Sequence, residues 1–219
     1  LIMLPARVAF EELGFHYTYN KSKKAIYVTG NTTTTNAPAS TPIVNEPAVN
    51  TGLQATAFKN MSTQEFINAV GPIAREDYRK TGVLASVTLA QAINESGWGK
   101  SGLTQNSNNM FGMKTSLSGN SWSGSVWDGR SYVEVKTREE YNGKKVTITA
   151  KFRKYPSVAQ SIADHSAYLS NAMNGARRRY NGLTDTKSYS SQLTILQKGG
   201  YCTWSGYVSE LTTLIKKYD

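Results

Sequence analysis

The stretch "LAQAINESGWGKSGL", residues 89–103, decides the fold of this chain, because it ends an apolar helix on a single carboxylate. Residues from Val83 to about Glu95 are apolar on nearly all sides, which is typical of a helix buried in a core. Glu95 is the only charged residue of that helix, and the break at Gly97-Trp98-Gly99 follows directly. We expect the backbone to turn away there and to leave the carboxyl at the mouth of whatever the helix borders.

The environment of Glu95 predicts an unusual protonation state. Burial disfavours the ionised form of a carboxyl, so we expect the pKa of Glu95 to be raised. A carboxyl that keeps its proton near neutral pH suits general acid catalysis. The helix alone supports equally a glutamate that caps a neighbouring helix or pairs with a lysine.

The segments around this stretch predict a mainly helical α+β domain that begins near Phe58. The capping-box pattern from Ser62 to Glu65 precedes "FINAVGPIAREDYRK" and predicts a helix there. Residues 129–155 alternate as two strands around Asn142-Gly143, a strong hairpin turn. Three further helices are expected within residues 156–173, 190–200 and 204–218. The prediction is a helical domain with one β lobe.

The first 57 residues have a different character. Residues 1–29 predict a short helix and a hairpin, and they loosely resemble one unit of the copper amine oxidase N-terminal-like domain found on bacterial surface proteins. That resemblance implies no copper, and these residues contain no ligand cluster. Residues 30–57 carry one charge, Glu46, among Thr, Asn, Pro and Ala, which is typical of a flexible linker.

The charge of the chain favours a polyanionic partner. The formal net charge is +10, and nine of these ten charges arise after Ala57. Nucleic acid, anionic lipid and anionic wall polymers all fit this positive field. No apolar run approaches the ~20 residues of a membrane span. The start lacks the pattern of a signal peptide, so we expect a processed or cut form, and the one cysteine, Cys202, excludes an internal disulfide.

Glycosidic chemistry would need a second carboxylate, and the predicted hairpin offers Glu134, Glu139 and Glu140. Strand alternation places Glu134 and Glu140 on an all-charged face that we interpret as solvated surface. Glu139 shares the opposite face with valine and tyrosine side chains, so we expect it to point inward. The alternative is a structural pairing of Glu139 with Arg153 across the hairpin.

Four blocks together resemble a known family. They are "LASVTLAQAINESGWGKSGL", "SNNMFGMK", "VKTREEYNGKKVTITAKFRKYPSVAQSIADH" and "KGGYCTWSGYVSEL", in this order within residues 58–219. The chain is similar there to glycoside hydrolase family 73, the bacterial peptidoglycan N-acetylglucosaminidases. The resemblance implies a lysozyme-like helical fold with a β-hairpin lobe over the cleft. It also implies cleavage of the β-1,4 bond between N-acetylglucosamine and N-acetylmuramic acid.

The resemblance also implies roles for particular residues. Glu95 of "ESGWGKS" corresponds to the general acid, and Glu139 of "TRE" corresponds to the second carboxylate, with adjacent Glu140 as the alternative. Tyr201 follows the paired glycines and belongs to the family's site. This chain departs from the family at Trp204-Ser205, where the family usually has Asp-Pro, so the local loop and the role of Tyr201 are in question.

Several further residues are candidates for binding the substrate. The family blocks place Asn109, Phe111 and Tyr155 near the cleft, and Trp98 and Tyr207 are candidate platforms for sugar rings. Each aromatic side chain has a core residue as its ordinary alternative. His165, on a predicted helix, is interpreted as structural, and "RRRY" at 177–180 as a solvated turn with attraction to anionic wall polymers as its functional alternative.

The sequence therefore predicts a secreted or wall-located peptidoglycan hydrolase that needs no cofactor and no metal. Its partners would be glycan strands and anionic wall polymers, without nucleic acid. The second step stays open between an activated water and attack by the substrate's own acetamido group. The alternatives are a muramidase or lytic transglycosylase, which cleaves the neighbouring bond, and a non-catalytic wall-binding module.

Overall fold

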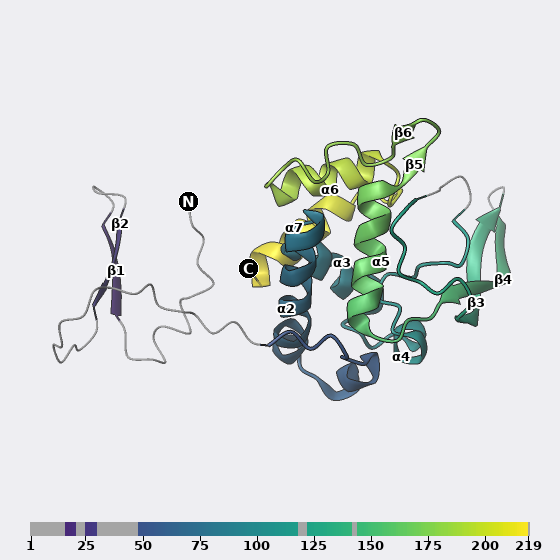
Figure 1. Ribbon diagram of the computed structural model, residues 1–219, viewed down its shortest axis with the longest axis horizontal. Coiled ribbons are helices and arrows are strands. Elements are labelled where there is room, and N and C mark those ends of the chain that lie inside the picture. Colours follow the sequence, from purple (N-terminus) through teal and green to yellow (C-terminus); the bar gives the residue numbers. More distant parts are fainter. Residues whose placement is uncertain (1–15, 21–24, 30–47, 118–121, 142–143, 219) are drawn as a thin grey trace. The chain divides into compact units, whose positions relative to one another are not determined.

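The computed structural model describes residues 16–20, 25–29, 48–117, 122–141 and 144–218 of the chain (Figure 1). Strand residues 16–20, 25–29, 137–141 and 144–147 are described by their backbone alone. The chain divides into two units, one within Leu1–Asn45 and one over Glu46–Tyr218. No helix of these described residues is both long and apolar enough to cross a bilayer.

The N-terminal unit contains the predicted hairpin. Strands β1 (His16–Asn20) and β2 (Ala25–Thr29) are antiparallel, with Tyr19 opposite Ile26. The short helix predicted before them lies outside the described residues. The same is true of most of the predicted linker, residues 30–47.

The second unit is a helical body with a β lobe at one side, as predicted (Figure 1). Its helices are η1 (Ala55–Asn60), α2 (Thr63–Thr81), α3 (Ala85–Ser96), α4 (Gly102–Ser107), α5 (Val158–Asn171), α6 (Tyr189–Lys198) and α7 (Tyr207–Tyr218). Helix α3 packs against α2, α6 and α7, and α5 packs against α2. Helix α3 therefore lies within the core, as its apolar sequence predicts.

The core begins before the predicted boundary at Phe58. Leu53 and Ala55 are buried together with Phe58, and the backbone carbonyl of Leu53 accepts a hydrogen bond from the amide of Val158. The packed part of the chain thus includes residues that we expected to belong to the linker.

Helix α2 begins as the sequence predicts. The hydroxyl of Ser62 accepts a hydrogen bond from the backbone amide of Glu65, and the Glu65 carboxylate accepts one from the amide of Ser62 at 2.7 Å. This reciprocal capping box satisfies two amides that a helix leaves unpaired at its start.

The Gly97-Trp98-Gly99 break ends α3 through three successive left-handed residues, with φ values of 57°, 61° and 71°. A Cβ atom on Gly99 would lie 2.2 Å from the ring of Phe58, whereas one on Gly97 would meet nothing within 4 Å. Gly99 is thus required both by its backbone angle and by close packing on the core. The turn leaves Glu95 in the last turn of the helix, as expected.

The β lobe is the antiparallel pair β3 (Tyr132–Tyr141) and β4 (Lys144–Arg153). Burial alternates along the start of β3: Val133 and Val135 are half-buried, and the residues between and beside them are exposed. This confirms the predicted faces for residues 133–136. The predicted turn residues, Asn142 and Gly143, lie outside the described residues, and the pairing of Tyr141 with Lys144 is the one such a turn requires.

A buried ion pair fastens the base of this lobe to α5. The Nη1 atom of Arg153 donates to Asp164 at 2.7 Å, and both side chains are almost fully buried. Asp164 also accepts hydrogen bonds from the hydroxyls of Tyr155, at 2.6 Å, and Ser125, at 2.6 Å. The guanidinium also lies over the rings of Trp122 and Trp127, 4.5 and 4.7 Å from their centroids.

This arrangement corrects one alternative from the sequence. Arg153 pairs with Asp164 and lies opposite Tyr132, whereas Glu139 lies opposite Val146, seven residues further along β3. A structural pair between Glu139 and Arg153 is therefore wrong, because the register keeps the two residues far apart along the ribbon.

A second, two-residue ribbon was not predicted. Strands β5 (Met173–Asn174) and β6 (Arg177–Arg178) form a tight hairpin after α5. It lies in the part of the sequence that contains "RRRY".

We expect Asp164→Ala to destabilise the domain by about 3–5 kcal/mol, because it leaves the buried Arg153 charge without its partner. Chemical denaturation monitored by tryptophan fluorescence measures this change. Glu76→Ala is the matched control: Glu76 pairs with Arg79 and Lys80 on the exposed side of α2, so its loss should leave the stability nearly unchanged. Equal losses in the two variants would contradict the anchoring role of Asp164.

Candidate active site

Glu95 lines a hollow of about 460 Å³ in the helical body. Phe111, Gly112, Met113, Leu117, Tyr168, Arg179, Tyr180, Gly200, Tyr201 and Cys202 form the rest of its lining. Of the residues predicted from the sequence, Glu95, Phe111 and Tyr201 meet here. They come from α3, from the loop after α4 and from the turn after α6.

Partial desolvation in the hollow raises the pKa of Glu95, which confirms the predicted direction, and a hydrogen bond with Asn94 offsets part of the effect. Glu95 is exposed at the edge of the hollow, which agrees with the expected place of its carboxyl at the mouth of the region that the helix borders. Its carboxyl is therefore accessible to a substrate, while surrounding protein still disfavours its ionised form.

Tyr201 lies deeper in the same hollow and is half-buried. Its hydroxyl lies 2.9 Å from Nε2 of His165, and burial, with the nearby charge of Glu95, raises its pKa well above the ordinary value. Tyr201 is therefore a neutral hydroxyl throughout the physiological pH range.

His165 supports both Tyr201 and Phe111. It is fully buried on α5, and its ring stacks on Phe111 with the centroids 3.8 Å apart. Burial lowers the pKa of His165 to about 3, so the ring is uncharged. The structural role predicted for His165 takes this concrete form: it holds two residues of the hollow.

The paired glycines before Tyr201 have a packing reason. Arg179 holds their carbonyls: Nε donates to Gly199 at 2.7 Å, and Nη2 donates to Gly200 at 2.9 Å. A Cβ atom on Gly199 would lie 2.5 Å from the ring of Tyr180, and Gly200 has φ of +75°. The turn that presents Tyr201 thus accepts only glycine at these two positions without rearrangement.

The interpretation of "RRRY" as a solvated turn is wrong for its second half. Arg177 and Arg178 are exposed, but Arg179 is half-buried and Tyr180 is buried, and both line the hollow. The sequence does not reveal that Arg179 turns inward, because nothing local distinguishes an arginine that binds backbone carbonyls from one in water.

Four other predicted residues lie outside the lining of the hollow. Asn109 is buried, and its amide bonds to the backbone of Met113 and Arg153, so it holds the loop that carries Phe111. Tyr155 is buried and donates to Asp164. The remaining two, Trp98 and Tyr207, pack against other aromatic rings.

Packing contacts explain why Trp98 and Tyr207 do not line the hollow. The ring of Trp98 packs in T-shaped contacts against the rings of Phe66 and Tyr218. Tyr207 is buried beneath Tyr201, with the ring centroids 5.9 Å apart, and its hydroxyl accepts a hydrogen bond from Gln91. Its place is behind the hollow, as support for Tyr201.

Glu139 and Glu140 belong to β3, but their side chains lie outside the described ones, so their roles stay predictions. Among the described residues, no group of three or more His, Cys, Asp or Glu is placed to hold a metal ion.

Comparison with known proteins identifies the family. Residues 71–219 match the glucosaminidase family, described as mannosyl-glycoprotein endo-beta-N-acetylglucosaminidase. The chain belongs to this family of glycoside hydrolases. No finding supports the resemblance of residues 1–29 to a copper amine oxidase N-terminal-like unit.

Two relatives of this glucosaminidase domain are an exo-glucosaminidase and a peptidoglycan hydrolase by name. It is 35% identical over 156 residues to the exo-glucosaminidase LytG of Bacillus subtilis, covering 71% of this chain and 51% of LytG. It is 34% identical to the peptidoglycan hydrolase FlgJ of Pseudomonas aeruginosa, over 71% of this chain and 37% of FlgJ. The chain thus spans about half or less of the length of these relatives.

A solved structure has the same fold. The catalytic domain of the autolysin Auto from Listeria monocytogenes is 34% identical, with a TM-score of 0.60 over 73% of this chain and 86% of that domain. The lysozyme-like α+β fold predicted from the sequence is confirmed.

We expect Glu95→Gln to stabilise the domain at neutral pH. The folded-state pKa of Glu95 is raised, so its ionisation opposes folding once the pH exceeds that pKa, and this penalty is absent below about pH 4, where both states are protonated. The melting temperature of Glu95→Gln should exceed that of the wild type at pH 7 and equal it near pH 4. Calorimetry at the two pH values measures this.

Glu65→Gln provides a control of opposite sign, because hydrogen bonds from Ser62 lower the pKa of Glu65. Its ionised form favours folding, so this substitution should not raise the melting temperature at pH 7. A lower melting temperature for Glu95→Gln at pH 7 would contradict the raised pKa.

Proposed function

We propose that this domain hydrolyses the glycan strands of peptidoglycan at the β-1,4 bond between N-acetylglucosamine and N-acetylmuramic acid. It cleaves internal bonds of the strand, and it acts in the cell wall. One observation carries the proposal: in a chain of the glucosaminidase family, Glu95 has a raised pKa and lines a hollow beside the Tyr201 hydroxyl. The substrate is supported by the names of two relatives, the peptidoglycan hydrolase FlgJ and the exo-glucosaminidase LytG. The positive net charge suits anionic wall polymers as a second partner.

In this proposal Glu95 is the general acid. Its protonated carboxyl donates to the glycosidic oxygen as that bond breaks, and the sugar ring develops the charge of an oxocarbenium ion. The exposed position at the mouth of the hollow lets the glycan reach the carboxyl, and the partial desolvation keeps the proton available.

Tyr201 is proposed as a hydrogen-bond donor to the sugar. Nε2 of His165 is bonded to Tyr201, whereas Nδ1 has no partner among the described residues. A buried acceptor without a partner is tolerated better than a buried N–H without one, which favours the tautomer protonated on Nε2. His165 then donates to the Tyr201 oxygen, and the hydroxyl proton of Tyr201 points to a group in the hollow.

Glu139 is proposed as the second carboxylate. The alternation seen at Val133 and Val135, continued along β3, predicts that Glu139 shares their face and that Glu140 does not. Glu139 would activate a water on the far side of the ring, or Glu139 or Tyr201 would orient the substrate's own acetamido group. The separation of the two carboxylates in the substrate complex distinguishes these routes.

A muramidase is the second candidate function. The domain is 30% identical over 217 residues to a protein of Lactococcus lactis named a probable N-acetylmuramidase, covering 96% of this chain and 44% of that protein. The two activities cleave alternate bonds of one strand, so the sugar at the new reducing end distinguishes them.

Digestion of purified peptidoglycan tests the proposal, with reducing ends identified by borohydride reduction and mass spectrometry. We expect new N-acetylglucosamine ends and fragments of many sugars early in the reaction. Glu95→Gln should lower kcat by about 10²–10⁴-fold. Glu139→Gln should lower it strongly as well, whereas the adjacent Glu140→Gln should have little effect.

New N-acetylmuramic acid ends would instead establish the muramidase. Near-full activity of Glu139→Gln, with anhydro ends, would indicate a transglycosylase that works with one acid. Equal digestion by wild type and Glu95→Gln would refute the acid assignment.

Tyr201→Phe separates the hydroxyl from the ring. We expect kcat to fall about 10²-fold, because a donor that strengthens in the transition state is lost while the ring packing on His165 remains. Tyr207→Phe is the matched control, since its hydroxyl faces Gln91 in the core and its loss should affect stability rather than kcat. Steady-state kinetics on a soluble glycan oligomer would reject the donor role if both variants kept full kcat.

A further inference from the structure

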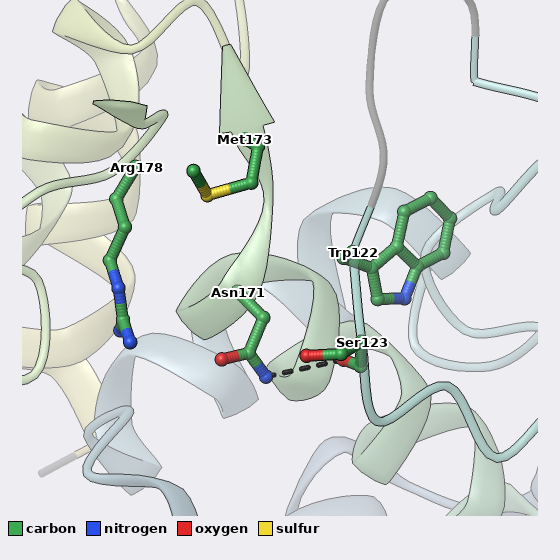
Figure 2. A pocket seen from close by; sticks show the side chains of 5 residues that line it. All are labelled: Trp122, Ser123, Asn171, Met173 and Arg178. Carbon is green, nitrogen blue, oxygen red and sulfur yellow. Dashed lines mark hydrogen bonds between the residues drawn. The ribbon is translucent and has the colours of Figure 1, made fainter. Parts of the chain in front are cut away.

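A second hollow, of about 390 Å³, lies where α5 ends (Figure 2). Its lining consists of Trp122, Ser123, Asn171, Met173 and Arg178, none of which lines the Glu95 hollow. We call it the Arg178 hollow. The proposed reaction uses none of these residues.

The Arg178 hollow adjoins the Glu95 hollow. The ring of Trp122 packs edge-on against Tyr168 with the centroids 5.1 Å apart, and Tyr168 lines the Glu95 hollow. The neighbours Arg178 and Arg179 line one hollow each. Because the two linings contact each other, a branched ligand that spans both hollows is the candidate that we consider.

Arg178 brings a positive charge to this hollow that no carboxylate of the described residues neutralises. Its Nη1 donates to the carbonyl of Ser170, at the end of α5, over 3.0 Å. This bond anchors the side chain, while the other guanidinium N–H groups have no protein partner within the described chain. A guanidinium held in this way is suited to a carboxylate or a phosphate.

Asn171 adds an acceptor to the same hollow. Its Nδ2 donates to the carbonyl of Ser123 at 3.3 Å, and Figure 2 shows its amide oxygen on the opposite side, which faces Arg178. A cation beside an amide oxygen complements a ligand that carries both a carboxylate and N–H groups. A phosphate polymer has the anion but supplies no N–H to Asn171.

Met173 completes the lining with an apolar contact. It lies directly opposite Arg178 in the β5–β6 register, so both side chains emerge on one face of the ribbon, and Figure 2 shows them flanking the hollow. The flexible thioether adapts to small aliphatic groups of differing shape. Carboxylate, N–H and aliphatic group together describe a short acidic peptide.

We propose that the Arg178 hollow binds an acidic peptide by its carboxylate, and that this peptide is the branch carried by the glycan in the Glu95 hollow. The inference rests on the proposed function for the identity of the glycan. The site would favour strands whose sugars still bear their peptides over bare strands.

A binding experiment tests the site without relying on catalysis. A synthetic peptide of stem composition, with its carboxylates free or amidated, is titrated into the protein by calorimetry or NMR. We expect the free-acid peptide to bind about tenfold more tightly than the amidated one, and Arg178→Gln to remove this difference. Arg177→Gln is the matched control, since Arg177 is exposed on the same strand and does not line the hollow.

Kinetics then connect the site to the glycan. On intact peptidoglycan, Arg178→Gln should raise KM about five- to tenfold with kcat unchanged; on strands stripped of peptide by an amidase, its KM should match the wild type. Equal peptide binding by wild type and Arg178→Gln would overturn the proposal. So would Arg178-dependent binding of a soluble glycerol phosphate polymer that exceeds binding of the peptide, or an equal rise of KM on both substrates.

The two proposals fail in different ways. If wild-type protein leaves peptidoglycan intact but shows the Arg178-dependent preference for the free-acid peptide, the proposed reaction fails and the peptide site stands. If digestion proceeds and the peptide preference is absent, the reaction stands and the site falls. A lowered melting temperature of Arg178→Gln without any change in binding would show that Arg178 only caps α5.

Discussion

The buried contact between Arg153 and Asp164 is the interaction on which the functional architecture depends. It joins the last residue of β4 to the middle of α5, and the same carboxylate binds Tyr155 and the loop at Ser125. Charges buried this deeply are tolerated only when every partner is present. Loss of any one of these partners would leave a buried polar group unpaired, so the attachment of the β lobe to the helical body depends on the complete set.

Helix α5 links this connection to the hollow. Asp164 and His165 are consecutive, and they point to different neighbours: one holds the base of the lobe, and the other holds Phe111 and Tyr201. Because both side chains belong to one rigid helix, α5 positions both the base of the β lobe and the hydroxyl of Tyr201. Helix α5 thus fixes the base of the lobe and one side of the hollow together, which pre-organises the two relative to each other.

Most of the fold could be predicted from the sequence, because its signals are local. The capping box at Ser62, the apolar helix that ends on Glu95, and the alternation of β3 each depend on neighbours along the chain. The buried positions of Asn109 and Tyr155 could not be predicted. Asn109 bonds to backbone groups that are distant in the sequence, and Tyr155 bonds to Asp164.

The lining of the hollow was predicted in part for the same reason. Glu95, Phe111 and Tyr201 lie in motifs that resemble the family, whereas Tyr168 and Arg179 carry no local mark that separates them from ordinary helix and turn residues. Three arginines in a row have the composition of a solvated segment, so the sequence predicts a surface position for Arg179. Only the fold shows that the third one turns inward to the glycine carbonyls.

The antiparallel register restricts how the strands of the β lobe can change in length, because side chains alternate between the two faces of the ribbon. Seven residues separate Tyr132, which pairs with Arg153 at the fastened end, from Glu139, a span of roughly 23 Å at the rise of an extended strand. Adding or deleting one residue in this interval would carry the carboxylate to the opposite face, whereas adding two to each strand would only move it further out. Changes of the lobe by an even number of residues per strand would therefore keep Glu139 on the same face of β3, whereas changes by an odd number would move it to the other face.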